Sequence, residues 1–114
     1  DELLTVKGKI HTQEVLVDLN GAVAPDYVFE KYFDGSSNLY TVYVFPSLSE
    51  IEQYVKEHHH LPGVPSAKEL DENGLSLKKM NLLLLEKLEE LTLFTIQQQK
   101  EIDILKESLM VLDH

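Results

Sequence analysis

Residues 76 to 113 read SLKKMNLLLLEKLEELTLFTIQQQKEIDILKESLMVLD, a stretch that contains neither proline nor glycine. Side chains of similar character recur in it at alternating spacings of three and four, which is the period of one helix face. Ser76 is a suitable N-cap residue at its start. The pattern predicts one helix of about 55 Å, far longer than the globular average of ~11 to 12 residues.

This predicted helix carries a heptad seam, with positions a and d of a seven-residue repeat on one face. Most of these positions are leucine or isoleucine, and Thr95 and Gln98 form a polar break that can fix register at a cost in stability. Glu101 at g and Lys106 at the following e would attract each other between parallel chains. The oligomerisation seam consists of Leu84, Leu88, Leu91, Thr95, Gln98, Ile102, Leu105, Leu109 and Leu112.

The first half of the helix is more widely apolar than a simple coiled coil. Leu82, Leu83 and Leu85 lie off the seam, so residues 77–96 are expected to contact both partner helices and their own head. The alternative is a single helix that folds back on its own domain, but no later helix exists to cover the part after Gln97. Leucine at both a and d does not choose between two, three and four chains.

A shorter helix is predicted to begin at the capping box SLSE, residues 47–50, and to end near His59 or His60 because Pro62 cannot continue it. The consecutive histidines 58–60 point about 100° apart from one another on a helix, so they cannot all bind one ion. We therefore predict no metal site, and the alternative of one histidine from each subunit at a symmetry axis stays open.

A second short helix is predicted from the capping box SAKE, residues 66–69, to Asn73, with Gly74 as its C-terminal stop. The chain turns on both sides of it, and this corner aims the long helix. We call it the hinge, and it consists of Pro62, Gly63, Pro65, Ser66 and Gly74.

The N-terminal half has the period of β-strands. Strand candidates are residues 3–18, 26–33 and 38–45, which are rich in β-branched and aromatic side chains. All but one of the nine aromatic residues lie between Tyr27 and Tyr54, where we expect the core. The predicted fold is α+β, with a small β/α head over residues 1–75 and a coiled-coil segment over residues 76–114 that forms a parallel, trimeric bundle.

Composition excludes several classes of function. A net charge of −10 argues against nucleic-acid binding, and the absence of cysteine rules out thiolate and disulfide chemistry. The longest apolar run, residues 82–85, is far too short for a membrane span. No motif of a hydrolase, metalloprotease or nucleotide-binding enzyme occurs, so we predict no catalytic residue and no cofactor. The chain starts without methionine in strand-like sequence, and we expect a piece of a longer protein.

Several stretches together resemble a known family. They are residues 3–18, 25–31, 47–81 and 84–102, and the pattern HLPGVPSAKE..ENG at 60–74 is the most specific part. This sequence resembles the C-terminal module of large surface and tail-fibre-like proteins of Bacteroidetes bacteria and their phages. It is more distantly similar to the intramolecular-chaperone domain that ends phage tailspikes and endosialidases. Residues 33–45 are longer than the family's usual link at that place.

The resemblance implies a homotrimer, found outside the cell or at a virion tip, that helps an upstream β-stalk of the same chain fold in register. It also implies self-cleavage at a serine near the start of the domain, but no serine precedes Ser36. We therefore predict a non-enzymatic module that trimerises, registers and caps a fibrous protein. The alternatives are a self-cleaving chaperone and a fibre tip that binds a receptor or glycan through the aromatic residues of 27–45.

Overall fold

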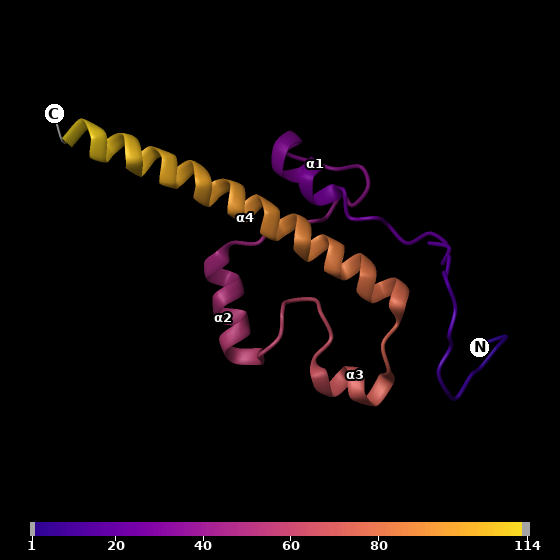
Figure 1. The fold of residues 1–114 in the computed structure, drawn as a ribbon. Coiled ribbons are helices and arrows are strands. Elements are labelled where there is room, and N and C mark those ends of the chain that lie inside the picture. The colour runs from indigo at the N-terminus through magenta and orange to yellow at the C-terminus, as the bar shows by residue number, and fades with distance from the viewer. Residues whose placement is uncertain (1, 113–114) are drawn as a thin grey trace.

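The computed structural model describes residues 2–112, and its secondary structure is entirely helical over that range. The four helices are α1 (Tyr27–Asp34), α2 (Leu48–His58), α3 (Ala67–Asn73) and α4 (Leu77–Leu112). Figure 1 shows α4 as a long rod with the smaller helices gathered along its N-terminal part. The prediction of an α+β fold is therefore wrong, since no strand occurs in residues 2–112.

The long helix has the extent that its sequence indicates. α4 runs for 36 residues without interruption, which corresponds to about 54 Å. Its expected end near Asp113 lies outside the described residues. The molecule is correspondingly elongated, with principal extents of 70 × 32 × 31 Å. The C-terminal half of α4 projects beyond the other helices (Figure 1), and every residue from Gln98 to Leu112 is exposed.

Residues 26–33 were expected to form a strand, and most of them form α1 instead. Val28 and Tyr32 are four residues apart, so one turn of helix brings both onto the face that packs against α4. Gly35 ends the helix in the left-handed conformation, with φ 84°, and its N–H donates to the Lys31 carbonyl. A short apolar run fits the period of a strand as well as that of a helix, and here it forms a helix that packs against α4.

The other two strand candidates, residues 3–18 and 38–45, also form no sheet. In residues 3–18 every side chain is exposed, and the described part of the chain offers no second strand to pair with. An unpaired strand leaves its backbone hydrogen-bonding groups to water, so alternation alone does not hold it together. Residues 38–45 contain a turn, closed by a 3.2 Å bond from the Tyr43 N–H to the Tyr40 carbonyl, and then cross α4 as irregular chain.

The core lies where the aromatic residues predicted it, between the segment before α2 and the middle of α4. Val28 and Leu93 are completely buried, and Tyr27 and Tyr43 pack beside them with ring centroids 4.9 Å apart. Each such side chain contributes about 1.5–3 kcal/mol through burial. α1 makes the main helix–helix contact with α4, so this small core fixes the head on one side of the long helix.

The helix boundaries around the hinge are those that the sequence indicates. The Ser66 hydroxyl accepts from the Glu69 N–H and the Glu69 carboxylate accepts from the Ser66 N–H, which confirms the second capping box. Ser47 accepts from the Glu50 N–H, although Glu50 binds the Ser47 hydroxyl and not its backbone. In the hinge itself, Gly63 adopts φ 77°, a conformation that glycine reaches without strain.

Candidate functional site: the exposed seam of the long helix

The predicted seam residues share one face of α4, and all of them are exposed to solvent in the single chain. The apolar members expose between 45% and 80% of their surface. Thr95 donates its hydroxyl to the Leu91 carbonyl at 2.9 Å, so this polar seam residue already has a hydrogen-bond partner in its own helix. Monomeric soluble proteins rarely expose a row of leucines of this length.

The head covers the opposite face of the same helix. The buried residues of α4 are Glu89, Glu90, Leu93 and Phe94, which occupy heptad positions b, c, f and g. Further along, the Gln97 amide donates to the Tyr32 hydroxyl at 3.1 Å. Because the head occupies only this side, the a and d positions remain free along the whole length of the helix.

A cluster of carboxylates, which the sequence did not single out, lies under the head. The Tyr27 hydroxyl donates to Glu86 at 2.6 Å, and the Tyr43 hydroxyl donates to Glu90 at 2.5 Å. Lys87 lies 3.3 Å from both glutamates. Burial, followed by these hydrogen bonds, raises the pKa of both tyrosines well above the ordinary value of 10. The tyrosines therefore act as fixed hydrogen-bond donors that join the head to α4.

Glu89 is the least satisfied member of this face. It is 5% exposed, and its Oε1 atom has no hydrogen-bond partner. Burial, and then the negative charges of Asp26 and Glu86, raise the pKa of Glu89 from 4.5 to about 7, while the Phe29 N–H acts in the opposite direction. Because Glu89 lies on the face of α4 that the head covers, we treat its carboxyl as part of the contact between head and helix.

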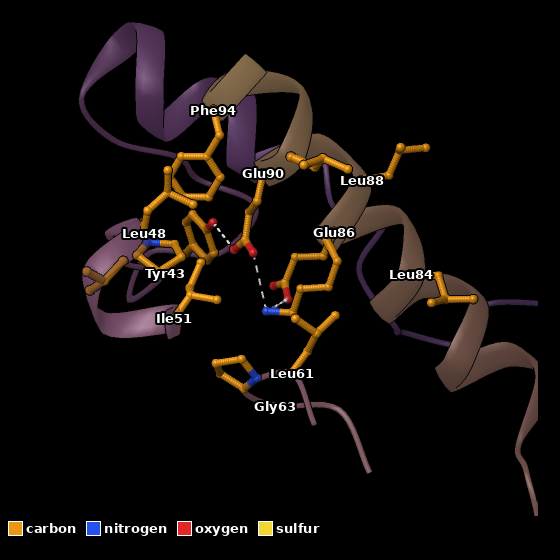
Figure 2. A pocket seen from close by; sticks show the side chains of 15 residues that line it. Tyr43, Leu48, Ile51, Leu61, Gly63, Leu84, Glu86, Leu88, Glu90 and Phe94 are labelled. Atoms are coloured by element: carbon orange, nitrogen blue, oxygen red, sulfur yellow. Dashed lines mark hydrogen bonds and ion pairs between the residues drawn. The ribbon is translucent and has the colours of Figure 1, made fainter. Parts of the chain in front are cut away.

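An apolar groove opens where the head meets the seam. It has a volume of about 620 Å³ and lies between α4 on one side and the start of α2 with the Leu61–Gly63 turn on the other. Figure 2 shows Leu48, Ile51 and Leu61 facing Leu84 and Leu88 across this space. Three seam residues, Leu84, Leu88 and Leu91, belong to its lining. The groove and the first part of the seam therefore share one apolar surface.

The three consecutive histidines do not converge on one point. His58 ends α2 with its ring 4.3 Å from that of Tyr54, His59 takes the left-handed C-cap conformation, and the His60 Nδ1 lies 3.0 Å from the Leu61 carbonyl oxygen. Within residues 2–112, no group of three or more metal-binding side chains comes together. The histidines thus end a helix, as the sequence predicted for them.

The aromatic residues of 27–45 were considered as a contact patch for a receptor. Most of them are buried or half-buried in the core, including Tyr27, Tyr43 and Phe45. Phe33 and Tyr40 are the exposed ones, at 63% and 43%. The seam and the groove beside the hinge are therefore better candidates for a contact surface than the aromatic residues of 27–45.

Comparisons with protein-family models, with curated proteins and with solved structures gave no match for this chain. Among the helices of residues 2–112, none combines the length and the apolar character needed to cross a membrane.

Proposed function

We propose that this chain is a non-enzymatic trimerisation module that brings three identical chains into register through α4 and caps the end of a fibrous surface or tail-fibre protein. The observation that carries the proposal is the position of the head. It packs on heptad positions b, c, f and g and leaves the whole a/d seam exposed. A helix folded back on its own domain would bury its apolar face, and α4 does not.

The mechanism is physical. Association of three α4 helices into a coiled coil raises the effective concentration of the segments that precede them in each chain. This favours assembly of those segments in register over wrong pairings. Register matters for extended structures because their contacts are distant in sequence and slow to form. The resemblance of residues 47–81 to the C-terminal modules of tail-fibre-like proteins supports a location outside the cell or at a virion tip. The more distant similarity to the chaperone domains of phage tailspikes supports three chains.

The parallel orientation is supported by the charges of the projecting half of α4. Glu101 at g and Lys106 at the next e lie at the spacing that pairs them between parallel neighbours. One exposed pair contributes only about 0.2–1 kcal/mol, so this pair favours the orientation and the leucines supply the stability. A parallel bundle also places all three heads at one end.

The test is the mass in solution, measured by light scattering, of two variants with the same change in charge. Ile102→Asp with Leu105→Asp places charges in the seam, whereas Ile104→Asp with Val111→Asp places them at c, on side chains that are also exposed, at 61% and 73%. The unmodified chain and the c variant should have three times the chain mass of 13.1 kDa. The seam variant should be monomeric, because a charge buried without a partner is strongly unfavourable.

Two results would overturn this function. One is a monomeric unmodified chain at concentrations of tens of micromolar or above. The other is a seam variant that remains a folded trimer, because a bundle held elsewhere would not respond to Asp at a and d.

A further inference from the structure

The groove beside the hinge has two walls of different origin. One wall belongs to the head and includes Val44, Ile51 and Leu61, and the other is the surface of α4. Figure 2 shows Glu90 of α4 reaching toward Tyr43 of the head between these walls, and Lys87 also belongs to the lining. Because Lys87 is paired with both Glu86 and Glu90 at 3.3 Å, an incoming group does not need to supply a charge for it.

The heptad assignment defines which edge of the seam the groove adjoins. Its α4 lining contains Lys87 and Phe94, which are g positions, in addition to the a and d leucines. No e position of α4 lines it. In a parallel bundle the g edge of one helix faces the e edge of its neighbour. The groove is therefore open toward the place where a neighbouring α4 would lie.

We infer that this groove receives the e edge of α4 from a second copy of the chain, so that each head clamps the helix of its neighbour as well as its own. The inference rests on the trimer proposed above and adds a second contact to it. The residue that enters is Leu85, which lies at e, is 41% exposed and does not line the groove of its own chain.

The length of the exposed surface favours a helix of the same kind as the occupant. The apolar lining of the groove leads into the seam, which after the polar residues Thr95 and Gln98 runs on through Ile102 to Leu112. A partner that covers the groove leucines would therefore lie in line with a partner that covers the remaining seam residues. A helix with the same repeat and a length of about 54 Å covers both, and α4 of a second copy is such a helix.

The residue types at the e positions differ between the part of α4 beside the groove and the part beyond the head. At the height of the groove they are Leu85 and Thr92, which are uncharged, and beyond the head they become Gln99 and Lys106. The two uncharged residues would meet the apolar walls, and Lys106 would meet Glu101 in water. This match also accounts for Leu85, which a coiled coil without a head would leave on its surface.

Cross-linking tests the contact directly because the chain has no cysteine of its own. The double variant Leu61→Cys with Leu85→Cys is treated with a short bismaleimide and run on a denaturing gel. Leu61 belongs to the head wall of the groove, and Leu85 lies on the e edge of α4, which does not line the groove of its own chain. We therefore expect covalent dimers and trimers between chains. The double variant Leu61→Cys with Leu16→Cys is the control, and it should remain a single-chain band.

Covalent species from the control instead of the first variant would put the N-terminal segment in the groove and overturn the inference. A trimer by light scattering in which neither variant cross-links would overturn the inference and leave the trimerisation function standing. A monomer would overturn both. These three outcomes separate failure of the clamp from failure of the trimer.

A second experiment compares two valines that are almost equally exposed, of which only one lines the groove. Val44 lines the groove and is 76% exposed, whereas Val42 does not line it and is 74% exposed. Val44→Asp should raise the concentration at which the trimer dissociates by about tenfold or more, and Val42→Asp should leave it unchanged. Equal effects of the two substitutions would overturn the inference, because only Val44 would face the neighbouring helix.

Discussion

Glu89 should make the stability of the folded chain decrease between pH 5 and pH 8. Its pKa is raised from 4.5 to about 7, first by burial and then by the charges of Asp26 and Glu86. Between these two values the folded chain holds a proton that the unfolded chain has released. Unfolding then releases that proton, so the free energy of unfolding falls as the pH rises, until the folded carboxyl has itself ionised.

The magnitude follows from the two pKa values. The full contribution is about 3 kcal/mol, and about 2.5 kcal/mol of it falls between pH 5 and pH 8. This is a large part of the total for a small domain, since domains are stable by about 5–15 kcal/mol. At pH 8 the folded chain therefore holds a buried carboxylate whose Oε1 atom has no partner, next to two further acids.

The substitution Glu89→Gln removes this dependence because the amide is close in shape and does not ionise. The assay is urea unfolding at pH 5, 6, 7 and 8, at one protein concentration because assembly ties stability to concentration. The difference in free energy of unfolding between variant and unmodified chain should change by about 2.5 kcal/mol over this range, in favour of the variant at high pH. Other groups that titrate in this range contribute equally to both proteins and cancel.

The control is Glu107→Gln, which removes the same charge from an exposed position of the same helix. Its unfolding should follow the unmodified chain within about 0.5 kcal/mol at every pH. A difference between Glu89→Gln and the unmodified chain that stays constant from pH 5 to pH 8 would show that Glu89 is ionised normally and refute the argument from its burial.

Three further predictions concern the head, the hinge and the histidines. Tyr43→Phe should destabilise the chain by about 1–3 kcal/mol in thermal or urea unfolding, because the Oε2 atom of the buried Glu90 loses its donor, whereas Tyr40→Phe should have little effect. Gly63→Ala should cost about 1–2 kcal/mol for its φ of 77°, and Gly8→Ala, at a glycine without positive φ, should not. A chelator should leave the melting temperature unchanged, and a shift would restore histidines 58–60 as metal ligands.

The long helix could be predicted because one signal repeats throughout it. Spacings of three and four persist over 36 residues without proline or glycine, and no strand pattern competes with them. The N-cap at Ser47 and the capping box at Ser66 were equally local signals, because a cap depends on residues three positions apart. Features of this kind need no knowledge of the rest of the chain.

The head could not be predicted in the same way. Residues 26–33 have apolar side chains at spacings that suit both a strand and a short helix. In the structure Val28 belongs to one core cluster with Leu93, which is far away in sequence. Residues 3–18 have β-branched side chains but no partner strand in the described chain. Strand propensity describes how well a residue fits a sheet, so it predicts little where no sheet forms.

The carboxylate cluster was missed for a related reason. Glu86, Glu89 and Glu90 occupy heptad positions f, b and c, which face water in a simple coiled coil, and acids there look ordinary. What buries them is a head whose tyrosines come from positions 47 to 59 residues earlier in the chain. The one available signal was the accumulation of tyrosines upstream, which need polar partners when they are buried.

This polar contact has a consequence for assembly. In the proposed trimer the head and the neighbouring helices would compete for the surface of α4, and an entirely apolar head would bind the leucine seam as readily as the opposite face. Tyr27 and Tyr43 prevent this, because on the seam their hydroxyl groups would find no carboxylate and each would cost about 1–3 kcal/mol. The bonds to Glu86 and Glu90 therefore hold the head on one side of α4, and that placement is what leaves the a and d positions free for other copies of the chain.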